Sequence, residues 1–449
     1  MKDRKWDFIP FSFYDRTGMA AHLENRAAQG WMLERISPFG WFYRRISPAQ
    51  LHFTVTYNHR MSEFAPGPTE EEQTYQDFCT HGGWQFVTQS GKMSFFSSAE
   101  PDPVPIETDP ILELKHIGRA MRPIVILLFF WLLIGFWMGG SWCYSLINHP
   151  IDLLANSLNF ATGLWWLGLF LYSAADLWSY FHWRHKTKQA AQLGEFVPTR
   201  GHHRLLLGVV ALVAASLLYW LLTDQTSGMR MMTLAWLAIY LVLLLAVQGT
   251  KQFLKRRGAP TGVNRAVTLS VDVILAFVLC GVVFFFLLHT VRTGISSPEL
   301  DAQPPLSIEA LAGGNQEDYI HSVRREESVF LARLTVQQFT NWHQSTKASS
   351  LDYTLLDIKV PFLYSLCLDD MLQAQNTGPS DYTYVTTAPT PWGAEAAYQL
   401  TLDGEALDRY LLCWPERMVS LDFNWIPTAE QMAQVGAAFN PAHAPDTAE

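Results

Sequence analysis

The stretch PIVILLFFWLLIGFWMGGSWCYSLI, residues 123–147, decides the fold because it contains no charged side chain in 25 consecutive positions. An α-helix needs about 20 apolar residues to cross the roughly 30 Å of hydrocarbon in a bilayer. The stretch therefore predicts a membrane-spanning helix, and the other parts of the chain can be assigned relative to it.

Four further apolar runs follow in the next part of the chain. They cover residues 153–180, 205–223, 231–247 and 266–290. Each is long enough, or nearly long enough, to cross a bilayer, and the run at 231–247 is the shortest. Buried helices of a soluble protein are the alternative interpretation. Five such runs in succession favour a bundle of five transmembrane helices over residues 123–292.

The composition also favours a membrane protein. Charged residues make up 16% of the 449 residues, whereas soluble proteins average about 25%. The apolar content of 49% excludes a disordered chain, and the pattern fits neither a coiled coil nor a small disulfide-rich protein. The formal charge of −9 is unevenly distributed, because residues 111–295 are net positive and the segments on both sides are net negative.

Lysine and arginine residues near the helix ends predict the orientation in the membrane. Thirteen lie before the first helix or in the second and fourth connections: Lys115, Arg119, Arg122, Arg184, Lys186, Lys188, Arg200, Arg204, Lys251, Lys255, Arg256, Arg257 and Arg265. Only Arg230 and Arg292 lie at the opposite helix ends. Because positively charged loops remain in the cytoplasm, we expect a cytoplasmic N-terminus and, after five crossings, an extracytoplasmic C-terminus. No apolar signal-peptide core follows MKDRK, so the first membrane helix is expected to direct insertion.

Residues 1–98 predict a small α+β cytoplasmic domain with a loose internal repeat. Each half contains a helix that ends at a glycine and is followed by a Gly-Trp pair, Gly30-Trp31 and Gly83-Trp84, which opens a strand. The repeated unit is a helix, a Gly-Trp pair, a strand, a turn and a strand. Residues 99–122 are expected to form a proline-rich linker and a short basic juxtamembrane helix.

Residues 319–440 predict a second α+β domain, on the extracytoplasmic side. The predicted strands cover residues 329–339, 381–387, 396–402, 409–414 and 417–425, and the predicted helices cover residues 361–373 and 429–439. Alternating apolar residues in the last strand are typical of a strand with one buried face. Residues 293–318 are expected to be a linker, and residues 441–449 a disordered tail.

Four residues of the N-terminal domain form a candidate surface for a ligand or a protein partner. Trp31 and Trp84 occupy equivalent positions in the repeat, and Arg44 and Arg45 follow in a nearby strand. Core packing of the tryptophans and solvation of the arginines are the alternative interpretations. The domain is net negative, which disfavours direct binding of nucleic acid.

Asp176 and Asp272 are candidate intramembrane polar residues. Both lie close in sequence to arginines of the cytoplasmic side, so we expect their carboxylates at a similar depth in the inner leaflet. Carboxylates inside a membrane are costly and are frequently functional. Hydrogen bonding between helices and a path for protons or a ligand both remain open. The Gly-x-Gly-Asp signature of intramembrane aspartyl proteases is absent around Asp272, which disfavours proteolysis.

Two cysteines are expected in the extracytoplasmic domain, Cys367 and Cys413. A disulfide between them would stabilise the domain by about 3–4 kcal/mol. Two buried thiols are the alternative.

Motifs for catalysis and for cofactors are missing from the sequence. It contains no Walker loop, no Gly-x-Ser-x-Gly elbow, no His-Glu-x-x-His and no kinase motif set. The histidines beside the second connection are His182, His185, His202 and His203. They fit an interfacial basic loop better than a metal site. We therefore expect a protein that is not an enzyme, with no catalytic residue, metal or cofactor.

The N-terminal pattern resembles a family of bacterial membrane proteins, domain-of-unknown-function family 2812 (DUF2812). The matching residues are Gly18-Met19, His22-Leu23-Glu24, Ala27-Ala28, Gly30-Trp31-Met32-Leu33, Gly83-Trp84 and Phe95-Phe96. The resemblance covers about residues 8–98, with membrane helices following as in the family, and residues 425–432 look like the tails of such proteins. It implies location in a bacterial cell membrane and a possible link to PadR-like transcription regulators. The family has no established activity, so it implies no catalytic residues.

Two functions from different classes follow as hypotheses. The first is a non-enzymatic sensor or regulatory scaffold that couples an extracytoplasmic domain to a cytoplasmic domain, with the lipid bilayer and a cytoplasmic protein as partners. The second is a transporter, or an accessory subunit of one, that uses Asp176 and Asp272. The sequence does not indicate a ligand or an oligomeric state.

Overall fold

The computed structural model describes residues 3–37, 40–58, 61–223, 227–293, 304–341, 349–373 and 382–441. The chain divides into two compact units. One unit contains residues 1–139, 164–216 and 229–286, and the other contains residues 140–163, 217–228 and 287–449. The predicted tail lies outside the described residues except for Pro441, and so does the first part of the predicted linker.

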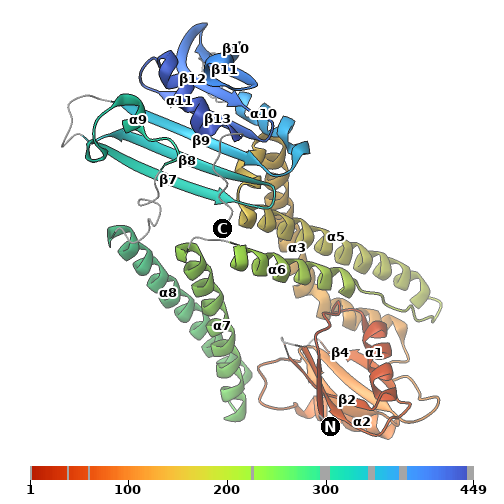
Figure 1. Ribbon diagram of the computed structural model, residues 1–449. Coiled ribbons are helices and arrows are strands. Elements are labelled where there is room, and N and C mark those ends of the chain that lie inside the picture. The colour runs from red at the N-terminus through yellow and green to blue at the C-terminus, as the bar shows by residue number, and fades with distance from the viewer. Residues whose placement is uncertain are drawn as a thin grey trace. The chain divides into compact units, whose positions relative to one another are not determined.

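The N-terminal domain consists of two strand-helix-strand-strand units (Figure 1). The first contains β1 (Arg4–Asp7), α1 (Arg16–Ala28), β2 (Trp31–Ser37) and β3 (Gly40–Arg45), and the second contains β4 (His52–Tyr57), α2 (Glu70–His81), β5 (Gln85–Ser90) and β6 (Met93–Ser98). Each unit forms an antiparallel three-stranded sheet, in the orders β1-β3-β2 and β4-β6-β5. The repeat is therefore one strand longer than the sequence predicted, because β1 was not predicted and β4 opens the second unit.

Local hydrogen bonds explain where the two helices begin and end. The Asp15 carboxylate caps α1 by accepting from the Gly18 N–H, and Thr69 and Glu72 form the capping box of α2. Gly30 and Gly83 follow the helices with φ of 82° and 83°, values that residues with a Cβ rarely adopt. Both Gly-Trp pairs therefore mark the change from helix to strand.

The core of the N-terminal domain is completed by two long helices. Tyr14, Met19, Leu23 and Tyr43 of the domain are buried in one apolar cluster. The same cluster contains five buried residues from outside the domain: Ile117, Ala120 and Met121 of α3 (Pro110–Asn148), and Tyr180 and Trp183 of α5 (Ser157–Ala191). The domain and these helix ends therefore form one folded body.

Within the described residues, four helices are long and apolar enough to cross a membrane: Pro110–Asn148, His203–Leu221, Leu234–Arg256 and Thr261–Phe285. They lie in α3, α6 (His203–Thr223), α7 (Ser227–Arg256) and α8 (Thr261–Thr293). The predicted second crossing corresponds to α5, which is a helix of 35 residues but does not meet this condition. Polar residues along α5, including Ser173 and Asp176, reduce its apolar character.

The predicted juxtamembrane helix is not a separate element. It forms the first turns of α3, which continues through Pro123. Further along, Gly135 and Gly139 let α3 approach α5 closely, because a Cβ at these positions would lie 3.0 Å from Phe170 Cβ and 2.9 Å from Leu167 Cδ2.

The C-terminal domain contains a seven-stranded antiparallel sheet with the order β10-β11-β12-β13-β9-β8-β7 (Figure 1). The strands are β7 (Tyr319–Glu327), β8 (Leu331–Thr340), β9 (Ser350–Ile358), β10 (Tyr382–Thr387), β11 (Ala396–Leu402), β12 (Glu405–Cys413) and β13 (Arg417–Phe423), and the helices are α9 (Ile308–Ala312), α10 (Tyr364–Leu372) and α11 (Ala429–Phe439). Strands β7 and β9 were not predicted. Part of the predicted linker belongs to this domain, because Leu306, Ile308 and Leu311 are buried in its core.

Both faces of this sheet are apolar and covered. One cluster contains residues of α9 and α11. The other contains residues of α10 together with Ile151, Leu154 and Ala155, which come from the connection between α3 and α5 that includes α4 (Pro150–Leu154). This connection is therefore part of the C-terminal core, although residues 153–155 were predicted to belong to the second crossing.

Candidate functional site

A buried polar junction joins the N-terminal domain to α5 and to the connection between α5 and α6. The Ser12 hydroxyl donates a hydrogen bond to the Asp176 carboxylate at 2.5 Å, and the His202 N–H donates to the Ser12 oxygen at 3.2 Å. Asp176 is only 2% exposed. The ring nitrogen Nε2 of His202 lies 2.6 Å from the Ser179 hydroxyl oxygen, whereas the bond to Ser12 comes from the His202 backbone N–H. Asp176 thus bonds a residue of the N-terminal domain.

A second set of contacts extends this junction along the same connection. The Thr199 hydroxyl donates to the Asp15 carboxylate at 3.2 Å, and the Thr17 N–H donates to the Thr199 oxygen at 3.0 Å. The Tyr14 hydroxyl donates to the Arg200 carbonyl oxygen at 3.0 Å. Glycine is required at position 201 because a Cβ there would lie 2.6 Å from the Ser12 side chain. The N-terminal segment is therefore held closely against residues 199–202.

The adjoining ends of α7 and α8 make a third contact with the N-terminal domain. The fully buried Asn264 side chain, in the first turn of α8, donates to the carbonyl oxygen of Phe64 at 2.9 Å, and Lys251, near the end of α7, forms an ion pair with Glu63 at 3.0 Å. The first turns of α3, the connection α5–α6 and these ends of α7 and α8 therefore all meet the same domain.

The two candidate intramembrane aspartates have different environments. Asp176 is buried and bonded to Ser12, whereas Asp272 lies half-buried on α8. Among the described residues, no hydrogen bond or ion pair joins the two carboxylates. No signal in the sequence indicated Ser12 as the partner of Asp176.

The two tryptophans of the repeat also differ. Trp84 is 5% exposed and its Nε1–H donates to the Val104 carbonyl oxygen at 2.7 Å, so it packs in the core and holds the linker. Trp31 is half-buried, with the Arg45 guanidinium 4.9 Å from the centre of its ring. Arg44 lies exposed on the same strand as Arg45. Trp31 and Arg45 therefore remain a candidate surface, Arg44 lies on the opposite face of β3, and Trp84 is a core residue.

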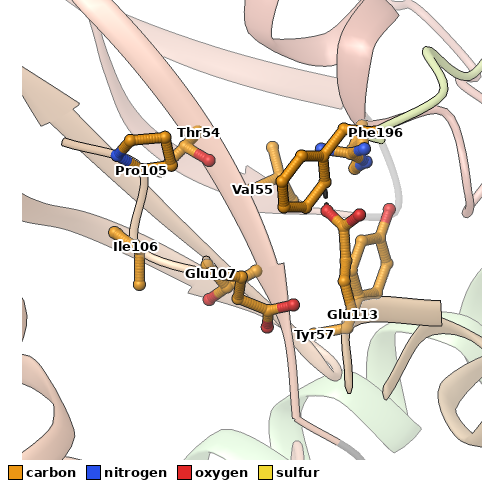
Figure 2. A pocket seen from close by; sticks show the side chains of 10 residues that line it. Thr54, Val55, Tyr57, Pro105, Ile106, Glu107, Glu113 and Phe196 are labelled. Atoms are coloured by element: carbon orange, nitrogen blue, oxygen red, sulfur yellow. Dashed lines mark ion pairs between the residues drawn. The ribbon is translucent and has the colours of Figure 1, made fainter. Parts of the chain in front are cut away.

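A pocket of about 260 Å³ lies in the unit that contains the N-terminal domain (Figure 2). Strand β4 supplies one wall through Thr54, Val55, Thr56 and Tyr57, and the linker supplies Pro105, Ile106 and Glu107. Arg16, Glu113 and Phe196 complete the lining, from α1, α3 and the α5–α6 connection. The pocket therefore lies where the domain, the linker and the helices meet, and the sequence did not indicate it.

Carboxylates dominate the charged groups of this pocket. Arg16 pairs with Glu113 at 2.8 Å, and His116 Nδ1 lies 3.3 Å from Glu107 Oε1. Burial raises the pKa of the Glu107 carboxyl, and the His116 hydrogen bond and charge oppose this shift. Glu107 Oε2 is buried and has no hydrogen-bond partner among the described residues.

The C-terminal unit holds the α3–α5 connection by polar contacts as well as apolar ones. The Asp370 carboxylate accepts from the Ile151 N–H at 3.0 Å. Arg333 forms ion pairs with both Asp152 and Glu326. These contacts fix α4 against the sheet and α10.

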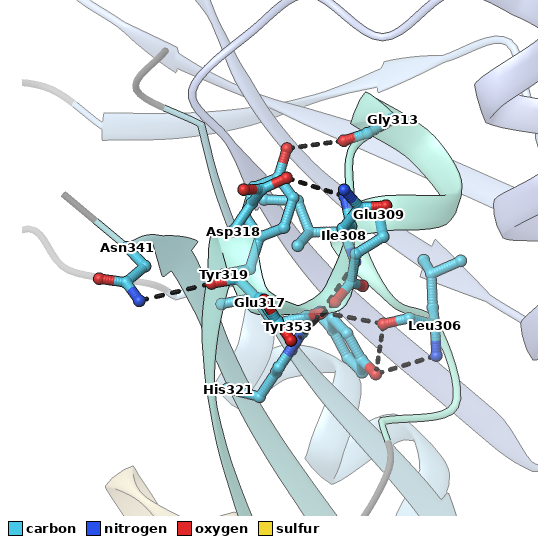
Figure 3. A network of polar contacts seen from close by, with 12 residues as sticks. Leu306, Ile308, Glu309, Gly313, Glu317, Asp318, Tyr319, His321, Asn341 and Tyr353 are labelled. Carbon is cyan, nitrogen blue, oxygen red and sulfur yellow. Dashed lines mark hydrogen bonds and ion pairs between the residues drawn. The ribbon is translucent and has the colours of Figure 1, made fainter. Parts of the chain in front are cut away.

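A second polar network ties α9 to the sheet, and it is centred on His321 (Figure 3). Gln338 accepts from the Ile308 N–H and donates to the Leu306 carbonyl, both at 2.9 Å, which fixes the orientation of its amide. His321 Nδ1 lies 3.0 Å from Gln338 Oε1, so this nitrogen must carry a proton. Nε2 lies 2.8 Å from Glu309 Oε1, so one further proton is shared between the imidazole and the carboxylate.

Cys367 and Cys413 are free thiols buried in the same apolar cluster, and they do not form the disulfide that was considered. Burial raises the pKa of each thiol to about 11, which keeps both protonated at neutral pH. No group of three or more histidines, cysteines and carboxylates that could hold a metal ion occurs in the described part of the chain.

The fold and these contacts define a class: a protein with a small N-terminal domain of two sheets, four helices in the described part of the chain that are candidates to cross a membrane, and a C-terminal sheet domain. Residues 17–129 match the model of the family described as "Protein of unknown function (DUF2812)", which confirms the resemblance seen in the sequence. The match extends beyond the predicted limit at residue 98 and includes the first half of α3. No curated protein and no solved structure matches the chain.

Proposed function

We propose that this protein is a non-enzymatic membrane sensor or regulatory scaffold, in which α3 and α5 couple an extracytoplasmic C-terminal domain to a cytoplasmic N-terminal domain. One observation carries the proposal. Ile117 and Tyr180 of these helices belong to the core of the N-terminal domain, while Ile151 of the connection between them belongs to the core of the C-terminal domain. A displacement at either end of a packed helix is transmitted along it, because close-packed elements shift as units.

The contacts of the N-terminal domain support the proposed orientation and the count of five crossings. The domain forms hydrogen bonds and an ion pair with the connection α5–α6 and with the adjoining ends of α7 and α8, and these regions carry most of the lysines and arginines. Helix α5, the second crossing in chain order, would bring the number of crossings from four to five. Its polar residues would be covered by neighbouring parts of the protein. The domain would then lie in the cytoplasm of a bacterial cell, at the inner surface of the membrane.

The lipid bilayer and a cytoplasmic protein are the partners that we propose. Trp31 and Arg45 offer an aromatic and basic surface for a protein, Arg44 adds a positive charge on the opposite face of β3, and a PadR-like regulator is one candidate. In-cell crosslinking tests this surface by comparing the unaltered protein with the double variant Arg44→Ala/Arg45→Ala. Loss of a specific crosslinked regulator in the variant would support the proposal, and an unchanged crosslinking pattern would exclude this surface.

The coupling itself is tested by releasing α4 from the C-terminal sheet. Ile151→Ser/Leu154→Ser, in the full chain in lipid nanodiscs, should increase amide hydrogen exchange in residues 12–18 and 199–202. Ile426→Ser is the matched control, because Ile426 belongs to the same domain and is 78% exposed. Unchanged exchange in the N-terminal segments, despite increased exchange around α4, would contradict coupling through α3 and α5.

A further inference from the structure

We propose that the pocket between β4, the linker and α3 binds a small organic cation, with an ammonium or guanidinium group at Glu107 and an apolar body against Val55, Ile106 and Phe196. This ligand site goes beyond the proposed coupling function and does not depend on it.

The size of the pocket limits the ligand. A cavity of about 150 Å³ binds benzene, and sites for drug-sized molecules begin at about 300 Å³. The volume of about 260 Å³ therefore fits one aromatic ring or a short alkyl chain together with a charged group.

The charge of the pocket selects a cation. Two carboxylates and one guanidinium line it, and the guanidinium of Arg16 is already paired with Glu113. Glu107 has only the imidazole of His116 near Oε1, while Oε2 has no hydrogen-bond partner among the described residues, although its side chain is only 16% exposed. A buried carboxylate oxygen without a donor is unfavourable, and an N–H group of a bound cation would supply the missing hydrogen bond.

The apolar part of the lining selects a ligand that is more than a bare ion. Val55, Ile106 and Phe196 contribute aliphatic and aromatic surface, and Phe196 is 41% exposed. An exposed aromatic side chain beside buried carboxylates can pack on the body of a ligand and also on its cationic group. A compound with a positive group on an apolar body uses both parts of the lining.

Binding should also change the protonation of Glu107. Burial raises the pKa of the Glu107 carboxyl in the empty pocket, and a cation beside it lowers this pKa. At a pH near the pKa of Glu107 in the empty pocket, ligand binding should therefore release protons, which calorimetry detects as a dependence of the binding enthalpy on the ionisation enthalpy of the buffer.

Three probes of similar shape test the proposal on the full-length protein in nanodiscs: benzylamine, benzyl alcohol and benzoate. We expect saturable binding of benzylamine with proton release, at least tenfold weaker binding of benzyl alcohol and no binding of benzoate. Equal binding of benzylamine and benzyl alcohol, or preferential binding of benzoate, would overturn the proposal.

Variants separate the site from nonspecific partitioning into lipid. Glu107→Gln keeps the shape of the side chain and should weaken benzylamine binding at least tenfold, whereas the exposed Glu195→Gln should leave it unchanged. Phe196→Ala, at the partly exposed wall of the pocket, should weaken the binding of benzylamine more than the binding of methylammonium. If Glu107→Gln binds benzylamine as the unaltered protein does, the site is wrong. The hydrogen-exchange test of coupling uses other residues, so the two proposals can fail separately.

Discussion

At the scale of single residues, Asp176 is the most informative position. Its carboxylate lies on α5 but accepts its hydrogen bond from Ser12, next to the connection that contains Thr199 and His202. The residue therefore helps to hold the N-terminal domain on the helices. The alternative function in transport would require its negative charge, whereas this holding role requires only an acceptor atom.

Two substitutions of Asp176 separate these roles. Asp176→Asn keeps an oxygen acceptor for Ser12 and should leave the thermal unfolding of the N-terminal domain nearly unchanged. Asp176→Leu leaves the Ser12 hydroxyl without its acceptor and should destabilise the domain by about 1–3 kcal/mol. Asp272→Leu, on α8, is the control. If Asp176→Asn and Asp176→Leu lower the stability of the domain equally and strongly, the charge of Asp176 is essential. The flux through reconstituted Asp176→Asn/Asp272→Asn protein would then test transport.

His22 predicts how the stability of the N-terminal domain depends on pH. Burial, helped by the charge of Arg26, lowers the pKa of His22 to about 4, below the value of about 6.5 for an unfolded chain. The unfolded state therefore binds the proton more readily between pH 6.5 and 4, and the domain should lose stability as the pH falls through this window. His22→Gln should reduce the loss, whereas His52→Gln, at a more exposed position, should not. Unfolding midpoints at pH 7 and pH 4.5 measure the difference.

At the scale of elements, the ends of helices are determined by short-range contacts. The capping boxes Thr69–Glu72 and Thr428–Gln431 both form, on α2 and α11. Thr69→Ala and Thr428→Ala should each destabilise their own helix by about 1 kcal/mol, because one backbone N–H loses its acceptor. Hydrogen exchange in residues 70–73 and 429–432 measures this effect, and serine at either position should preserve protection. Equal hydrogen exchange in the alanine and serine variants would show that the capping side chains do not stabilise the helices.

The segment α9 depends on a longer-range network. Glu309 and His321 share a proton, and Gln338 holds the backbone of Leu306 and Ile308. Glu309→Gln can donate its amide hydrogen to a neutral His321 and should keep α9 in place. Glu309→Leu removes the partner of Nε2 and should increase hydrogen exchange in residues 306–312. If both variants exchange like the unaltered protein, apolar burial alone holds α9.

At the scale of the whole molecule, the arrangement of charges predicts the topology. Arg44→Cys and Glu405→Cys introduce thiols at exposed positions of the N-terminal and C-terminal domains. A membrane-impermeant maleimide applied to intact cells should label Glu405→Cys and should label Arg44→Cys only after lysis. The unaltered protein is the control for the five native cysteines, of which Cys79, Cys367 and Cys413 are buried and Cys143 and Cys280 are exposed on α3 and α8. The reverse labelling pattern would contradict the proposed orientation.

Local signals predicted much of both domains. The Gly-Trp pairs, both capping boxes and the strands of residues 396–402 and 417–425 were recognisable because each depends on neighbouring residues or on short periodic patterns. Strands β7 and β9 were missed, and their pairing with β8 joins segments that no local pattern connects. The assignment of residues 304–312 to a linker failed for the same reason, since Ile308 is buried by residues far away in sequence.

The sequence alone was sufficient to predict long apolar helices, a repeated N-terminal domain that resembles the DUF2812 family and a C-terminal domain rich in strands, because hydropathy and helix caps act over one or a few turns. Which residues meet became visible only in the folded structure. Ser12 and Asp176 are 164 positions apart, and the walls of the pocket come from β4, the linker, α1, α3 and the connection between α5 and α6. Such contacts depend on the packing of complete elements, so the shapes of many side chains together select them, and no short stretch of sequence specifies them.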